Sequence, residues 1–133
     1  MQREKLYTKI KDWLLELNIE IVHENPNHQT FIISKEAEGI KNMILVIAPQ
    51  ILIIEQFLFS CKKDQPEVYK QLLIKNRDIV HGAFVLDETG ERVIFRDTLQ
   101  TENLDQNELV GTINSLSLLL SEYSAEMISF SKL

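Results

Sequence analysis

The fold of this chain is decided by residues 76–123, NRDIVHGAFVLDETGERVIFRDTLQTENLDQNELVGTINSLSLLLSEY. Two segments rich in β-branched and aromatic residues flank an acidic, Gly-containing turn at residues 87–91. This pattern predicts a β-hairpin between residues 81 and 97. A polar linker then leads into a long amphipathic segment that begins near Asp105. Two paired strands followed by a terminal helix restrict the folds that are open to the chain.

The terminal helix has a well-marked start. Asp105 is placed as the N-cap and Glu108 follows three residues later, which is the spacing of a capping box. Leu104 and Leu109 are spaced for a hydrophobic staple. Apolar residues then recur at intervals of four and three, and further apolar residues beside them widen the surface beyond one stripe. This wide apolar pattern indicates either a helix that is buried on two sides of its own domain or a helix that forms a dimer contact. The candidate residues for this surface are Leu109, Ile113, Leu116 and Leu120.

The upstream half predicts a helix, several strands and a second helix. Apolar residues at three-and-four spacing mark the first helix, between residues 6 and 17. Strands are expected at residues 19–23, 30–34, 44–47 and 51–54, the last two in the middle of the sheet. The second helix is expected to start near Asp64, with Asp64 and Glu67 as a capping box, and to end near Asn76. Its predicted buried side is formed by Val68, Leu72 and Leu73.

Composition restricts the class of protein. The chain has 133 residues, 44% of them hydrophobic, and a net charge of −6, which opposes binding to nucleic-acid backbones. The longest apolar run, residues 43–59, is interrupted by polar residues and is too short for a membrane span. A single cysteine and a polar amino-terminal segment lead us to expect a cytoplasmic protein without a disulfide. We expect one domain, residues 1–133, with no nucleic-acid or membrane partner.

The reactive side chains form no recognisable catalytic motif. The three histidines are scattered, so we expect no metal site, and the glycines form no phosphate-binding loop, so we expect no cofactor. Lys62 and Lys63 follow Cys61 and could lower the pKa of its thiol, although a small half-buried residue is the simpler interpretation. The acidic residues around Gly90 fit a solvated turn. Arg92 and Arg96 are expected to pair with acidic neighbours on adjacent strands. We therefore expect no enzyme activity.

The predicted order is α-β-β-β(-β)-α-β-β-α, an α+β fold with helices packed on an antiparallel sheet of five to six strands. This order resembles the type III secretion chaperone-like fold. The C-terminal half is similar to the YbjN family of small bacterial proteins, through Asn76, the segment GAFVLDETGE at residues 82–91 and the segment LDQNEL at residues 104–109. The resemblance covers about a third of the chain closely. It implies a small acidic cytoplasmic homodimer that binds other polypeptides, and it supplies no catalytic residues.

Our leading hypothesis is a non-enzymatic protein-binding module, chaperone-like or regulatory, that holds a partner polypeptide on apolar surface. If one face of the long strand beyond residue 50 is incompletely covered, the candidate contact residues are Ile51, Ile53, Phe57 and Phe59. The alternative is a small-molecule sensor or enzyme with a pocket between the sheet and a helix. A third possibility is a purely structural dimer subunit, which predicts neither a ligand nor a client.

Overall fold

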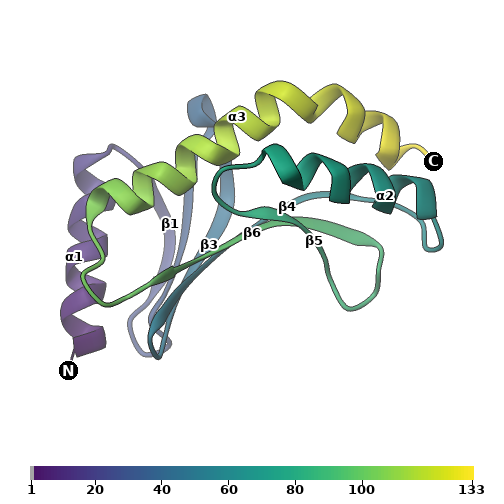
Figure 1. Ribbon diagram of the computed structural model, residues 1–133. Helices are drawn as coiled ribbons and strands as arrows, with labels where there is room; N and C mark the ends of the chain where they lie inside the picture. Colours follow the sequence, from purple (N-terminus) through teal and green to yellow (C-terminus); the bar gives the residue numbers. More distant parts are fainter. Residues whose placement is uncertain (1) are drawn as a thin grey trace.

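The computed structural model describes residues 2–133, and Figure 1 shows its arrangement of helices over a twisted sheet. The element order matches the prediction, with four strands before the second helix. In chain order the elements are α1 Gln2–Glu16, β1 Glu20–Asn25, β2 Thr30–Lys35, β3 Ile40–Ala48, β4 Ile51–Ser60, α2 Pro66–Lys75, β5 Ala83–Leu86, β6 Arg92–Gln100 and α3 Gln106–Ser131. Short 3-10 turns follow β2, at Glu36–Glu38, and α2, at Asn76–Asp78.

The six strands form one antiparallel sheet in the order β1-β2-β3-β4-β6-β5. β3 and β4 lie in its middle, as predicted from their β-branched sequences. β6 pairs with β4 along its whole length, from Ile51 opposite Gln100 to Ser60 opposite Arg92. β5 is therefore an edge strand, and the α2 segment crosses over to reach it. The fold is α+β with helices on an antiparallel sheet, as expected.

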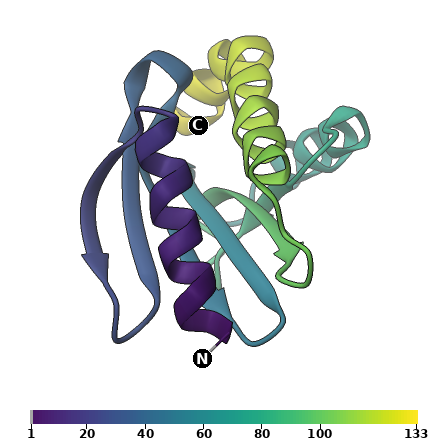
Figure 2. The ribbon, with the colours of Figure 1, turned by 90° about the vertical axis from the view of Figure 1, so that its left-hand side faces the viewer.

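One face of the sheet carries the core, and α1 and α3 cover it. Figure 2 shows α1 crossing in front of the strands, and Figure 1 shows α3 running along the top of the sheet. The buried side chains on this face include Phe31, Ile33, Leu45, Leu52, Ile54, Val93 and Phe95. They alternate with outward-facing residues because successive side chains on a strand point to opposite faces. The helices contribute Ile10, Leu14, Leu109, Ile113 and Leu116.

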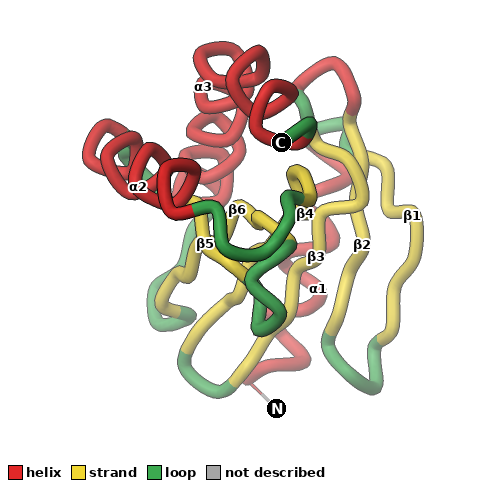
Figure 3. The backbone as a smooth tube through the Cα atoms, turned by 90° about the vertical axis from the view of Figure 1, so that its right-hand side faces the viewer, coloured by secondary structure: helices red, strands yellow, loops and turns green. Residues whose placement is uncertain are grey.

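The second helix lies beside the C-terminal half of α3, as Figures 1 and 3 both show. A buried lysine joins the two helices. Lys75 is 9% exposed, and its Nζ lies 2.6 Å from Glu126 on α3 and over the rings of Tyr123 and Phe130. A buried ammonium is tolerated only when it is paired, and the carboxylate and two ring faces supply that pairing. This contact fixes the packing of α2.

The predicted start of α2 is wrong in detail. The helix begins at Pro66 with Gln65 as N-cap, and no side chain caps it. Asp64 has a positive φ of 59°, so it lies in the loop and cannot form the capping box that its spacing with Glu67 suggested. Leu73 was expected in the core but is 69% exposed, whereas Val68 and Leu72 are buried as predicted. Two apolar residues, Leu73 and Ile74, therefore lie on the exposed side of α2.

The start of α3 is confirmed. The side chain of Asp105 accepts a hydrogen bond of 2.9 Å from the backbone N–H of Glu108. Leu104 and Leu109 are both buried, as the staple requires. The helix continues beyond Tyr123 to Ser131, and this extension packs against α2 and β4, with Phe130 6.3 Å from Phe59 between ring centroids.

Candidate polypeptide-binding face

The second face of the sheet is also apolar. Strand register places its side chains: Ile44 lies opposite Ile32, Val46 opposite Ile53, and Ala48 opposite Ile51. On the other side of β4, Phe57 lies opposite Ile94, which in turn lies opposite Val85 on the edge strand. We call this surface the outer face, and its apolar members are Ile32, Ile44, Val46, Ala48, Ile51, Ile53, Phe57, Val85 and Ile94.

No helix within residues 2–133 covers the outer face, because α1 and α3 both lie on the other side of the sheet (Figures 1 and 2). Its side chains are consequently half-buried or exposed. Phe57 is 45% exposed and Ile44 is 40% exposed, whereas their neighbours on the core face are almost fully buried. An uncovered apolar sheet face of this kind is typical of a surface that binds another polypeptide.

Polar groups interrupt the outer face along β4 and β6. Arg96 forms an ion pair with Glu55 on the neighbouring strand. The guanidinium of Arg92 lies 4.1 Å from the centroid of the Phe57 ring and 3.8 Å from Asp87. Arg96 therefore pairs with an acidic residue of an adjacent strand, as expected, whereas the acidic partner of Arg92 lies in the hairpin turn. The two arginines divide the apolar surface into a part over β2–β4, around Val46 and Ile53, and a part near Phe57.

The structure places three of the four candidate contact residues on the outer face and one in the core. Ile51 and Ile53 are half-buried there, and Phe57 is exposed. Phe59 is only 6% exposed and faces α3. The reason is a β-bulge between Phe57 and Phe59, which breaks the alternation that would have put both rings on one face. Phe59 is therefore a core residue and is unsuited to partner contact in this fold.

The candidate residues of the last helix pack within the chain. Leu109, Ile113 and Leu116 are at most 3% exposed, and Leu120 packs against the same core. Leu120 also contacts the turn at Gly39. Gly111 lies close to the ring of His81, with which an added Cβ would be in ordinary contact at 3.5 Å. The close neighbour of this glycine is thus a side chain of the same protein.

The remaining reactive groups fit structural roles. Cys61 is buried, and burial, with the nearby charge of Glu91, raises the pKa of its thiol, so the simpler structural interpretation holds and Lys62 and Lys63 do not lower that pKa. Asp87 accepts a hydrogen bond of 2.7 Å from Thr89 in the hairpin turn, which lowers the pKa of its carboxyl group. Among the described residues no three His, Cys, Asp or Glu side chains are grouped to hold a metal ion.

A second apolar surface lies on α2, and the sequence pattern did not predict it. Its exposed members are Leu73 and Ile74, at 69% and 49%. Both residues line a shallow depression of about 500 Å³ between Pro66 and Arg77. We call Leu73 and Ile74 the α2 patch. None of the helices in residues 2–133 is both long and apolar enough to cross a membrane.

The chain thus forms a helix-covered antiparallel sheet with one apolar face that the helices leave open. The chain belongs to the CesT_Tir_1 family, a family of type III secretion chaperones, whose sequence model matches residues 3–133. The resemblance found in the sequence is thereby confirmed. No curated protein sequence matches the chain.

Solved structures show the same fold. YbjN from E. coli, described as a putative transcription regulator, has a TM-score of 0.69 and 11% identity over 90% of this chain and 92% of its own. The complex of the chaperone SchA with the effector HopA1 has a TM-score of 0.60 and 15% identity, over 95% and 92%. The Yersinia pestis chaperone SycH, in complex with a fragment of YscM2, has a TM-score of 0.58 and 15% identity, over 94% and 98%.

Proposed function

We propose that this protein is a non-enzymatic, cytoplasmic binding module that holds a segment of a partner polypeptide on its outer face. The observation that carries the proposal is the apolar surface around Val46, Ile53 and Phe57, which no helix of the described chain covers. Membership of a secretion-chaperone family supports it, and two proteins of the same fold, SchA and SycH, have been solved with bound polypeptides.

The outer face suits an apolar client segment. Burial of apolar surface releases about 25 cal/mol per Å², so a few large client side chains over β3 and β4 supply most of the binding free energy. The ion pair of Arg96 with Glu55 and the guanidinium over Phe57 supply the polar contacts that fix orientation. This division between apolar area and a few polar contacts is typical of protein interfaces.

The experiment is native mass spectrometry of the protein purified gently from its own cells, compared with two variants. Ile53→Ser and Phe57→Ser each place a hydroxyl on the outer face, and we expect the stoichiometric client peak to fall at least about tenfold, as for a loss of about 1.4 kcal/mol. Leu118→Ser is the matched control, because Leu118 is 64% exposed on α3, away from the outer face. It should retain the client.

Two results would contradict the proposal. The first is undiminished client binding by both outer-face variants while circular dichroism shows that they keep the fold. The second is a wild-type protein that carries a small molecule in place of a polypeptide, which would support the sensor or enzyme alternative.

We also propose that the protein is a homodimer and that the α2 patch is its contact. Twofold contacts are self-complementary, and α2 has the charge distribution that an antiparallel helix pair needs. Glu67 lies in its first turn and Arg77 just beyond its end, so a second copy packed antiparallel would bring opposite charges together at both ends of Leu73 and Ile74.

A further inference from the structure

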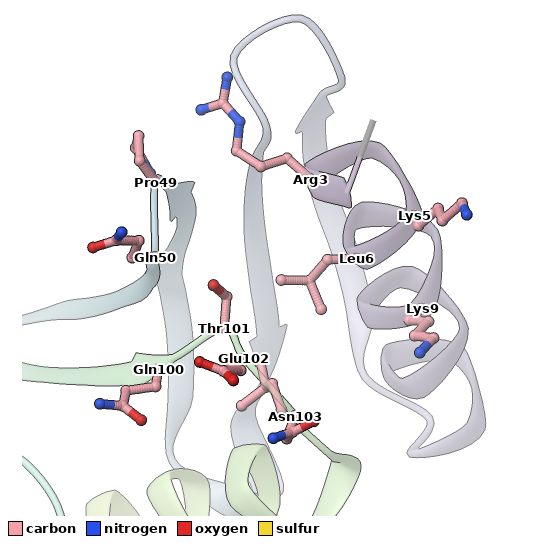
Figure 4. Close-up of a pocket in the computed structure, with 11 residues that line it drawn as sticks. Arg3, Lys5, Leu6, Lys9, Pro49, Gln50, Gln100, Thr101, Glu102 and Asn103 are labelled. Atoms are coloured by element: carbon pink, nitrogen blue, oxygen red, sulfur yellow. The ribbon is translucent and has the colours of Figure 1, made fainter.

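A cleft of about 1000 Å³ lies at the N-terminal end of α1, between three segments that are distant in sequence. Figure 4 shows its walls: the first turns of α1, the β3–β4 turn at Pro49 and Gln50, and the link from β6 to α3. The backbone N–H of Thr101 donates a hydrogen bond of 3.1 Å to the carbonyl of Gln50, which holds the two loops together. Leu104 is buried beneath the link.

The cleft is basic although the protein is acidic. Arg3, Lys5 and Lys9 line it, and Glu102 is the one acidic residue in its lining, against a net charge of −6 for the whole chain. All three cations are exposed, and none of them forms an ion pair within the part of the chain that the structure describes. The cleft is thus a local positive surface with available donors.

The placement of these cations works against the stability of α1. A helix N-terminus carries partial positive charge and favours acidic residues, yet Arg3 and Lys5 lie in the first turn, where only Glu4 is acidic. Lys5 and Lys9 are four residues apart on the helix, and like charges at this spacing destabilise it by about 0.2–0.5 kcal/mol. An anion bound in the cleft would relieve both repulsions. Local conflicts of this kind are typical of functional sites.

We propose that this cleft binds an acidic segment of a polypeptide, with carboxylates of the segment against Arg3 and Lys9. Lys5 extends away from the β3–β4 turn in Figure 4 and adds to the positive charge at the rim. The cations are spread along two helical turns of an open cleft, which suits charges that are spread along a peptide better than one compact phosphate group. The β3–β4 turn in its wall joins the strands that carry Ala48 and Ile51 on the outer face. A client held on the outer face can reach the cleft around this turn, so the assignment to a client rests on the proposed function.

The test uses a labelled peptide of alternating Glu and Ser, its Gln/Ser counterpart and fluorescence anisotropy. We expect the full chain to bind the Glu peptide and not the Gln peptide, with an affinity that falls as salt is added. The double substitution Arg3→Gln with Lys9→Gln should weaken binding at least about tenfold, whereas Glu102→Gln should strengthen it. Lys62→Gln with Lys63→Gln is the control for net charge, because both lysines are exposed at the other end of β4. It should leave binding nearly unchanged.

Three outcomes would overturn the proposal: equal binding of both peptides, an equal loss in the Lys62 and Lys63 control, or displacement of the peptide by equimolar inorganic phosphate, which would make the cleft a site for small anions. The Phe57→Ser variant separates this proposal from the previous one. It should bind the Glu peptide like the wild type, because Phe57 lies on the outer face and does not line the cleft. In Phe57→Ser, loss of the client with retained peptide binding agrees with both proposals. A retained client would contradict the proposed function, and lost peptide binding would contradict the proposal for the cleft.

Discussion

The turn before β3 depends on Gly39, which has a φ of 82°. A Cβ added there would lie 2.5 Å from Cδ1 of Leu120 on α3. The buried side chain of Gln56 completes the turn, since its amide donates to the Gly39 carbonyl and its oxygen accepts from the backbone N–H of Lys41, both at 3.0 Å. The packing of Leu120 and a hydrogen bond from Gln56 therefore meet at one position that has no side chain.

We expect Gly39→Ala to lower the free energy of unfolding by about 3 kcal/mol. The left-handed backbone accounts for about 1–2 kcal/mol and displacement of Leu120 for the remainder. Gly90→Ala is the matched control, because Gly90 has a φ of 75° but nothing lies within 4 Å of an added Cβ. It should lose only the backbone contribution. Urea denaturation of both variants measures the difference, and equal losses would show that the contact with Leu120 has no effect.

The side-chain positions of single residues could be predicted from the sequence only in part. Alternation correctly placed Ile51, Ile53 and Phe57 on one face, but Phe59 turned into the core because of a bulge that depends on the register with β6. Leu73 was predicted on the buried side of α2 with Val68 and Leu72, but only the latter two, which are four residues apart, are buried. Both errors concern contacts with a distant segment, which local periodicity does not contain.

At the scale of elements, α1 is tied to the edge strand β1 by a polar cluster. The Tyr7 hydroxyl donates a hydrogen bond of 2.5 Å to Glu24, and Lys11 lies 2.9 Å from the same carboxylate. The Tyr7 ring stacks on Phe31 at 4.4 Å between centroids. The hydrogen bond from Tyr7, followed by that from Lys11, holds the pKa of Glu24 below its usual range. Burial and the nearby Glu24 carboxylate raise the pKa of Tyr7.

This cluster predicts a dependence of stability on pH. Because the folded state lowers the pKa of Glu24, its contribution is present above the usual glutamate pKa of about 4.3 and is lost as pH falls through the lower folded value. We expect Glu24→Gln to destabilise the protein by about 1 kcal/mol at pH 7, and the difference from wild type to shrink progressively as the pH falls below about 4. The measurement is urea denaturation at each pH.

The control for this prediction is Glu20→Gln, on the same strand. Glu20 is exposed, and no ion pair to it occurs among the described residues. Its stability difference from wild type should stay small and nearly constant with pH. A Glu24→Gln difference that does not shrink as the pH falls from 7 to the lowest pH at which the protein stays folded would mean that the carboxylate charge does not stabilise the contact between α1 and β1.

The two predicted capping boxes have the same spacing and different outcomes. Asp105 follows an extended link and has the backbone conformation of an N-cap, with a φ of −125° and a ψ of 170°. Asp64 lies in the loop between β4 and α2, which is fixed by a 2.7 Å hydrogen bond from the Cys61 N–H to the Glu91 carbonyl. That loop gives Asp64 a positive φ. Cap residues can be recognised in a sequence, but the path of the preceding loop decides whether they act as caps.

At the scale of the molecule, the order of elements and the sheet were predictable because each depends on local periodicity and turn chemistry. The cleft was not predictable in this way. Its cations come from the first turns of α1, whereas Thr101 and Glu102 come from the link before α3. Only the folded topology brings these segments together. The outer face was predictable only in part. The strand pattern indicates that both faces of the sheet are apolar, but it does not indicate which face the helices cover.

The α2 patch and the cleft lie at opposite ends of the molecule, as α1 and α2 do in Figure 1. Occupation of one therefore leaves the other accessible. A dimer formed through α2 would keep both outer faces and both clefts available for clients. The homodimer proposal can accordingly be tested separately from client binding.

We expect the wild-type protein to have the mass of a dimer in size-exclusion chromatography with light scattering, and Leu73→Glu to have the mass of a monomer. Leu73 is 69% exposed, so a carboxylate is tolerated in the monomer but is desolvated without a partner charge in the dimer contact. Leu118→Glu makes the same change on α3, where Leu118 is 64% exposed, and should remain dimeric. A monomeric wild type would reject the homodimer, and a Leu73→Glu dimer would place its contact away from the α2 patch.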